Sequence, residues 1–297
     1  MAIHTLENGR LKVVINEMGG VIDVFTYGDE RPFDILRPRI HDGTNFAGNS
    51  SLFPMLPMVN RIRDNQFDWQ GRRVVLPINE SVDSHFFLHG NGWLIQWQCQ
   101  ANAECEHTVL KLAMASDIEG VCHYEAEQTY KLDGDRLTIT LCLTNIGDEV
   151  FPFGIGFHPF FHCLPDTLIK FSAQGIWLED VHYLPTDFME HIPDVFNFGQ
   201  GKTIPTVWIN NGYYLAEDGV NIILKHPNRV AVVVTSPCRY LQVYKPTGYS
   251  DFLCLEPQSQ SVNSHKTLYL DDSSNSLSIL APHHSMHIVM TIKVHEW

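Results

Sequence analysis

Long apolar runs are absent from this sequence. None approaches the roughly 20 residues that a membrane helix requires, so we expect no membrane span. Residues 1–7 lack a basic segment followed by an apolar one, and we therefore expect no signal peptide. Basic residues are few, with 20 Lys and Arg against 34 Asp and Glu and a net charge of −14. This balance argues against nucleic acid or an anionic membrane as a partner.

Paired cysteines are absent as well. The chain has seven Cys, an odd number, and none forms a CxxC pair. Cys142 and Cys254 fall within apolar runs that predict strands. We expect reduced thiols in a cytoplasmic protein, with neither a disulfide framework nor a zinc-thiolate site.

Convincing amphipathic helices longer than about two turns are also missing, and nothing suggests βαβ alternation. Period-2 patterns and frequent turns predict many short strands instead. The predicted strands cover residues 11–15, 21–27, 124–132, 137–143, 220–224, 230–235, 241–244, 252–255 and 286–294, whereas 41–58 is expected to be irregular. No linker or repeat divides the chain, so we predict one all-β domain over 1–297, a large and mostly antiparallel β-sandwich.

A histidine lies within an aromatic run after the predicted strand 137–143. His158 stands between Phe157 and Pro159, a setting that is unusual for a plain surface residue. A core histidine bonded to a backbone carbonyl is the alternative to a functional one. His162 follows four residues later, which is a metal-like spacing on a helix. Pro165 follows closely and the stretch does not look helical, so we expect no metal site.

Three further polar clusters have the same character. Asn60-Arg61 ends a long Gly- and Pro-containing loop, where binding groups are often found. His89 is followed by Gly90, whose backbone can approach a ligand closely, although an aromatic-packed turn is an equal alternative. Glu256 follows the apolar run 252–255 and precedes Pro257, which we expect to end the strand. A rigid, partly desolvated Glu suits a general base, while an edge-strand charge is the other interpretation.

Aromatic residues accompany these polar groups in the sequence. Trp69, Trp93, Phe160 and Phe161 stand near them along the chain. Aromatic faces beside hydrogen-bonding groups are typical of a sugar site, because rings pack on C–H faces and polar groups bind hydroxyls. No Gly-rich phosphate loop is visible.

Together these motifs resemble those of the aldose 1-epimerase (galactose mutarotase) family. The matching pieces are Asn60-Arg61-Ile62, Leu88-His89-Gly90, His158-Pro159-Phe160-Phe161 and Glu256 after an apolar strand, in the family's order. The resemblance covers roughly residues 11–294. It implies a β-sandwich and interconversion of the α and β anomers of free aldoses, without a cofactor.

The resemblance also implies a role for each residue. Glu256 would be the general base and His158 the general acid, while Arg61 and His89 would bind the sugar. We place Asn60 and Gln258 among the substrate-binding residues too. Mutarotation removes the proton of the anomeric hydroxyl while the ring oxygen is protonated, and ring closure uses the same two groups in reverse. We therefore expect nearby negative charge to favour the imidazolium form of His158.

Two positions depart from the family pattern. Asn210 stands where the family usually has an Asp that binds sugar hydroxyls, and Pro257-Gln258 replaces an expected Thr-Gln. We assign Asn210 to substrate binding, because an amide both donates and accepts. These departures indicate a divergent member of the family and leave its preferred aldose open.

Other functions remain open at this point. A sugar-binding or regulatory protein on the same fold needs no catalytic pair. A phosphorylated hexose would require added basic groups, for which Arg63 and Arg72 are candidates. A glycosidase needs paired carboxylates, whereas Glu256 is the one clear acid at a strand end. A cupin-like metal enzyme needs a tighter set of His and Glu ligands than this sequence shows. We expect a small-molecule sugar as the partner and a monomer or homodimer.

Overall fold

A computed structural model describes residues 2–44, 46–100, 108–266 and 277–297. The named strands all pair in antiparallel fashion and form two large sheets. The first sheet runs β1 (Ile3–Glu7), β2 (Leu11–Asn16), β3 (Val21–Tyr27), β5 (Leu52–Met55), β13 (Gly156–His162), β22 (Phe252–Gln258), β21 (Tyr240–Lys245), β18 (Ile209–Tyr214), β15 (Gly175–Glu179), β16 (Pro185–Met189), with β4 (Phe33–Asp34) beside β3.

The second sheet has nine strands within the described part of the chain. Its order is β17 (Lys202–Thr203), β14 (Leu168–Lys170), β19 (Val220–Lys225), β20 (Val230–Ser236), β24 (Ser285–Glu296), β11 (Arg136–Asn145), β10 (Cys122–Asp133), β9 (Val109–Ile118), β8 (Gln98–Cys99). Two hairpin-like pairs complete the described strands: β12 (Phe151–Phe153) with β23 (Ser278–Leu280), and β6 (Gln66–Trp69) with β7 (Arg72–Val75). The short 3₁₀ helices are η1 (Ala47–Asn49), η2 (Arg63–Asn65), η3 (Gly92–Leu94), η4 (Asp194–Phe196), η5 (Ser264–Lys266).

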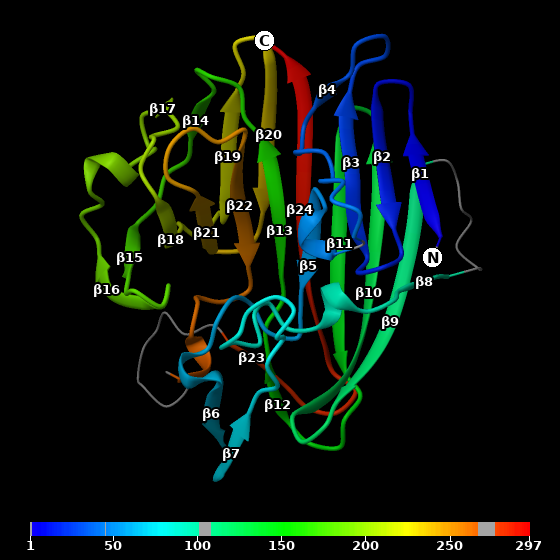
Figure 1. Cartoon of the computed structure of the whole chain (residues 1–297), viewed down its shortest axis with the longest axis vertical. Coiled ribbons are helices and arrows are strands. Elements are labelled where there is room, and N and C mark those ends of the chain that lie inside the picture. The colour runs from blue at the N-terminus through cyan, green and yellow to red at the C-terminus, as the bar shows by residue number, and fades with distance from the viewer. Residues whose placement is uncertain (1, 45, 101–107, 267–276) are drawn as a thin grey trace.

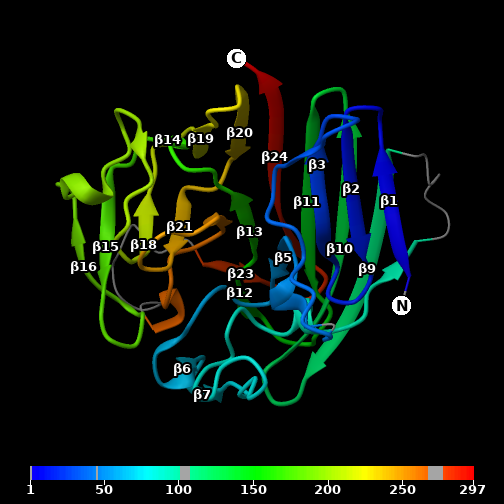
Figure 2. The same ribbon diagram turned by 45° about the horizontal axis from the view of Figure 1, so that its top comes forward.

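The two sheets stack as the layers of a sandwich (Figures 1 and 2). Alternating apolar side chains of both sheets fill the space between them. Leu137, Ile139 and Leu141 of β11 meet this core from one side, and Leu253 and Leu255 of β22 meet it from the other. The predicted all-β sandwich is therefore confirmed. Among the described residues, no helix is long and apolar enough to cross a membrane.

The predicted strands are confirmed, with ends that differ by at most three residues, and the strand predicted over 21–27 matches at both ends. The predicted hairpin of 124–132 and 137–143 is β10 and β11, with Gly134 at a positive φ of 57° in its turn. Residues 52–55 of the stretch expected to be irregular form β5, because they pair with β13 in the sheet interior. Strand β9 was not predicted, although Leu110, Leu112 and Met114 alternate toward the core.

Pro257 does not end its strand, so that expectation is wrong. β22 continues to Gln258, and Pro257 pairs with Leu241 of β21. β22 also pairs with β13 on either side of Pro257, at Gly156↔Gln258 and Phe160↔Cys254. A proline lacks only its own backbone N–H donor, and β22 stays paired with β21 at this position. Glu256 consequently lies inside a paired strand.

Candidate active site

Five neighbouring strands of the first sheet place the candidate site. They are β13, β22, β21, β18 and β15, and each turns alternate side chains away from the core. In β22, Leu253 and Leu255 enter the core, while Cys254 and Glu256 point to the opposite face. The period of two thus puts polar groups from distant parts of the chain on one face of the sheet.

His158 and Glu256 meet at the centre of this face. The register of β13 and β22 sets the two residues opposite each other, between the pairs Gly156↔Gln258 and Phe160↔Cys254. His158 Nε2 lies 3.2 Å from Glu256 Oε1, and both side chains are buried. Gln258 Nε2 donates to the other carboxylate oxygen, Glu256 Oε2, at 3.3 Å. The paired carboxylate and imidazole that the sequence predicted are therefore in direct contact.

Aromatic rings fix the plane of the His158 imidazole. Phe53 stacks on it at 4.4 Å between ring centroids, and Phe160 lies tilted at 4.7 Å. Trp93 in turn stacks on Phe53. Phe161 points instead into the core between the sheets, and Trp69 donates to the Val150 carbonyl at a distance from the pair, so their expected place at the site is wrong.

Burial changes the protonation of the pair. It lowers the pKa of His158 to about 3, helped by the positive charges of Arg37 and Arg61. Burial also raises the pKa of Glu256 to about 8. The expected imidazolium form of His158 is therefore wrong, because desolvation is the largest influence on its pKa and favours the neutral ring. Near neutral pH the pair holds one proton, on Glu256, and the imidazole is neutral.

His89 reaches the pair from a loop that is locked to Asn60. The His89 amide donates to the Asn60 carbonyl at 3.0 Å, and the Asn60 amide lies 3.3 Å from His89 Nδ1. Nδ1 must accept this bond, so the remaining proton belongs on Nε2. Burial and the nearby His158 lower the pKa of His89 well below its usual value. A neutral His89 can thus offer one N–H donor.

Gly90 makes this loop possible. It adopts a φ of +70°, and a Cβ at this position would lie 2.1 Å from the Leu56 carbonyl oxygen. The Leu56 and Gly90 backbones form a parallel bridge. His89 itself has a φ of 59° and Asn60 a φ of 56°, conformations that are uncommon outside glycine. Strained backbone of this kind is often found at ligand sites.

Arg61 supplies the positive charge on the same side. Its Nη1 donates to Asn60 Oδ1 at 3.3 Å, and its Nη2 lies 3.7 Å from Asp83 Oδ2. The guanidinium lies over the Tyr183 ring, 5.2 Å from its centroid. It is close enough to Glu256 for each charge to affect the pKa of the other.

Asn210 is tied to a carboxylate that the sequence did not point to. Asn210 Nδ2 donates to Glu179 Oε2 at 2.6 Å, and Trp208 Nε1 donates to Glu179 Oε1 at 2.6 Å. Gln242 Nε2 donates to Asn210 Oδ1 at 2.9 Å. Burial raises the pKa of Glu179. An Asp at 210 would set two carboxylates against each other, which explains why this chain has an amide there.

These groups surround an open cavity of about 300 Å³. This volume is at the small end of the range for ligand pockets and suits a monosaccharide. Its walls are Asn60, Arg61, Leu88, His89, His158, Tyr183, Trp208, Asn210, Tyr244, Glu256. Six of the seven predicted site residues line it. Gln258 does not, because it lies behind Glu256 and is buried.

Tyr183, Trp208 and Tyr244 are the wall residues that sequence reasoning missed, together with Leu88. They provide the aromatic faces of the cavity. Trp208 and Tyr244 contact each other edge-on at 5.4 Å, and Tyr183 lies 5.5 Å from Trp208. A signal for one of them existed, because Trp208 is two residues before the predicted site residue Asn210. Residues two apart share a face of a strand.

A possible set of metal ligands also occurs here. The donor atoms of His158, Cys254 and Glu256 lie within 4.8 Å of one another, and all three side chains are buried. The sequence predicted Cys254 only as a reduced thiol within an apolar strand. Burial raises the pKa of the Cys254 thiol well above its usual value, and a protonated thiol is a poor ligand.

Comparison with known proteins gives the family of this chain. The aldose 1-epimerase family model matches residues 2–291. The chain belongs to the aldose 1-epimerase family. It is 37% identical to the uncharacterized protein YphB of Escherichia coli K12 over 304 residues, with both proteins covered completely. It is also 28% identical to the uncharacterized protein YihR of the same organism, over 71% of this chain and 70% of that one.

Solved structures of aldose 1-epimerase relatives share the fold. An Escherichia coli K12 protein, provisionally described as an aldose 1-epimerase, matches with a TM-score of 0.88 and 35% identity over 100% of this chain and 99% of that one. A galactose 1-epimerase from Lactobacillus acidophilus matches with a TM-score of 0.75 over 98% and 93%. At 16% identity, the second likeness shows the fold alone.

Proposed function

We propose that this family member is an active aldose 1-epimerase, which interconverts the α and β anomers of a free aldose by opening and closing the sugar ring. The observation that carries the proposal is the 3.2 Å contact between His158 Nε2 and Glu256 Oε1 at the wall of a sugar-sized cavity. It brings an acid and a base within reach of two neighbouring oxygens of one sugar.

The pair of His158 and Glu256 holds the one exchangeable proton that the reaction needs. One group must take the proton of the anomeric hydroxyl while the other protonates the ring oxygen, after which the C1–O5 bond breaks. The raised pKa of Glu256 and the lowered pKa of His158 favour a single exchangeable proton, held by the carboxyl. Transfer across the 3.2 Å contact gives the imidazolium and carboxylate, the form with His158 as acid and Glu256 as base. Rotation of the open aldehyde and the reverse transfers close the ring on its other face.

The other polar groups orient the sugar in this proposal. The Nε2–H of His89 and the Arg61 guanidinium are donors for ring or hydroxyl oxygens. Tyr183, Trp208 and Tyr244 offer faces for the C–H side of the sugar. Such positioning adds to the roughly 10²–10⁴-fold contribution of general acid–base catalysis. No cofactor takes part in this scheme.

A non-catalytic sugar-binding protein is the second candidate. It would use the same aromatic faces and Arg61, but it has no need for a buried acid–base pair. The contact between His158 and Glu256 favours the enzyme, because an imidazole and a carboxylate that are both costly to bury have no evident use in binding alone.

The test is the rate of anomer exchange. Fresh α-glucose and α-galactose are followed by polarimetry or by NMR exchange of the anomeric protons, with and without the protein. We expect acceleration that is lost in His158→Ala and in Glu256→Gln. Saturable sugar binding without acceleration over a panel of free and phosphorylated aldoses would instead support the binding protein.

A further inference from the structure

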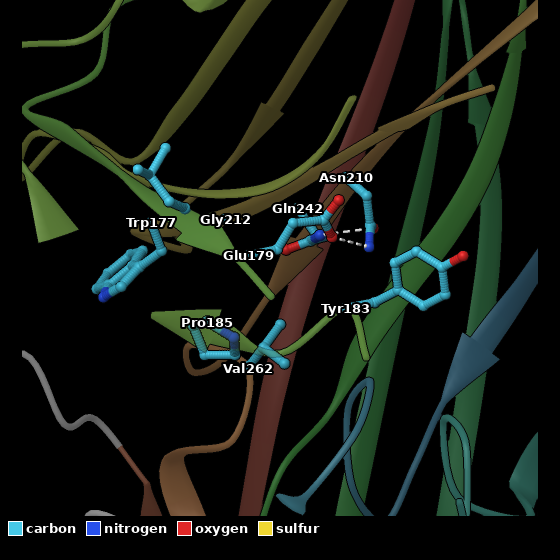
Figure 3. A pocket seen from close by; sticks show the side chains of 9 residues that line it. Trp177, Glu179, Tyr183, Pro185, Asn210, Gly212, Gln242 and Val262 are labelled. Atoms are coloured by element: carbon cyan, nitrogen blue, oxygen red, sulfur yellow. Dashed lines mark hydrogen bonds between the residues drawn. The ribbon is translucent and has the colours of Figure 1, made fainter. Parts of the chain in front are cut away.

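A small recess opens beside the main cavity, and Asn210 and Tyr183 belong to both. Its free volume is about 20 Å³, enough for a single water-sized group. Figure 3 shows Glu179, Asn210 and Gln242 gathered between Trp177 and Tyr183. Gly212 also forms part of the wall.

Hydrogen bonding fixes which atoms the recess presents. A carboxylate only accepts, so Asn210 must turn its NH₂ toward Glu179, at 2.6 Å. Its oxygen then faces Gln242, whose NH₂ donates to it at 2.9 Å. Gln242 is therefore oriented as well, with its carbonyl oxygen on the other side. The charge on Glu179 sets the direction of the whole chain of bonds.

The oxygen left over has no partner. Gln242 is 3% exposed, and its Oε1 is buried without a hydrogen bond among the described residues. Oε1 lies 3.4 Å from where a Cβ of Gly212 would be, so it is at the wall that Gly212 forms. Leaving a buried acceptor unpaired costs free energy. A ligand that brings a donor into the recess would remove this cost.

Glu179 has spare capacity as an acceptor too. Each of its oxygens accepts one bond, from Trp208 and from Asn210, and a carboxylate has about four acceptor positions. The side chain is only partly buried. Asn210, Gln242 and Trp208 each give one N–H donor to this network, so the donors nearest Glu179 and Asn210 are directed at protein acceptors. The recess therefore presents acceptor oxygens to a ligand, and it suits a ligand group that donates a hydrogen bond.

From this geometry we infer that the recess is a specificity subsite for one hydroxyl group of a neutral aldose, whose single O–H donates to Glu179, with Gln242 Oε1 as the alternative acceptor. The inference rests on the proposed function. In this proposal the carboxylate that binds the sugar hydroxyl is Glu179 of β15, and Asn210 of β18 holds Glu179 in place by a hydrogen bond. A sugar that lacks this hydroxyl, or carries it as a methyl ether, brings no donor and forfeits this hydrogen bond.

The test compares hydroxyl-deleted sugars. Anomer exchange of the preferred aldose and of its 2-, 3-, 4- and 6-deoxy analogues is measured by NMR for the wild type and for Glu179→Gln. We expect one analogue to lose about 10- to 100-fold in kcat/KM with the wild type, as for a hydrogen bond to a charged group. Glu179→Gln should lose a similar factor with the parent sugar and discriminate little against that analogue.

Two variants separate the subsite from general effects. Asp187→Asn removes the same charge from an exposed position on the neighbouring strand β16 and should behave as wild type. Gly212→Ala adds a methyl group to the recess without altering charge and should weaken the parent sugar more than the analogue. If Glu179→Gln and Gly212→Ala both keep the wild-type ranking of the deoxy sugars, the inference is overturned.

Failure of the proposed function would look different. A wild type that accelerates no aldose removes the epimerase proposal, and the subsite is then tested by calorimetric titration of the same sugars. Weaker binding of the parent sugar to Glu179→Gln, matched by the wild type with one deoxy analogue, supports the subsite. Equal affinities across the panel overturn it.

Discussion

At the scale of single residues, the chemistry of this site depends on one shared proton. His158 and Glu256 are buried together, and burial disfavours the charged form of each. The neutral pair and the ion pair contain the same number of protons, so the contact can supply an acid and a base in either direction. Adding or removing one proton destroys that property.

The pH dependence of the rate follows from these shifts. Exchange requires one proton on the pair, so kcat/KM should be bell-shaped. The acid limb should reflect protonation of His158, with a pKa of about 3, and the alkaline limb the loss of the Glu256 proton, with a pKa of about 8. A rate that stays constant through pH 9 would contradict the assignment. The uncatalysed rate at each pH serves as the control.

Stability should respond to the same group. The pKa of Glu256 is higher in the folded protein than in the unfolded chain. Its contribution to the free energy of unfolding is therefore fully present below the pKa of the unfolded chain and is lost as the pH rises through about 8. Glu256→Gln has no such proton to lose. We expect its melting temperature, relative to that of the wild type, to be higher at pH 9 than at pH 6. An equal difference at both pH values would show that the carboxyl is not buried in its neutral form.

At the scale of elements, the site depends on a loop held against β5. Gly90 approaches the Leu56 carbonyl, and this approach presents His89 to the cavity. The strained φ of His89 is tolerated because Asn60 bonds to both its backbone and its ring.

Gly90→Ala should therefore affect both stability and function. Its methyl group would collide with Leu56, so we expect a loss of about 1–3 kcal/mol in unfolding free energy and a raised KM. Gly71→Ala is the matched control, because it has a similar φ of +79° and nothing within 4 Å. Chemical denaturation and steady-state kinetics measure the two effects. A KM change in the control equal to that of Gly90→Ala would contradict the role of the loop.

The strands could be predicted from the sequence because a strand that buries one face alternates apolar and polar residues with a period of two. It also indicated His89, His158 and Glu256 through their aromatic or apolar surroundings. The family resemblance, not spacing, suggested that they meet. Glu179 escaped prediction because its partners are 29 and 31 residues away, and only the order β21–β18–β15 brings it to Asn210. The protonation of His158 was mispredicted because burial cannot be gauged from neighbours in sequence.

At the scale of the whole molecule, one sheet carries the site and the other sheet completes the core. The pocket residues come from the first sheet and its loops, while β11 and β24 cover its inner face. Stability and specificity should therefore be separable by mutation.

Ile292→Ala in β24 tests this separation. Ile292 is fully buried between the sheets, so its truncation should cost about 2–5 kcal/mol of unfolding free energy. Well below the melting temperature, KM should stay within about twofold of wild type, because the site and this position belong to different sheets. A large KM change with little loss of stability would show that the second sheet shapes the pocket directly.

The sequestered His158–Glu256 pair has one more consequence. Mutarotation in free solution depends on buffer molecules, which act as the acid and the base. Here the proton that opens the ring is stored on the pair and returns to it when the ring closes, so a turnover begins and ends with the same protonation. At fixed pH and ionic strength, the protein-catalysed rate should be indifferent to buffer concentration, while the background reaction continues to rise with it.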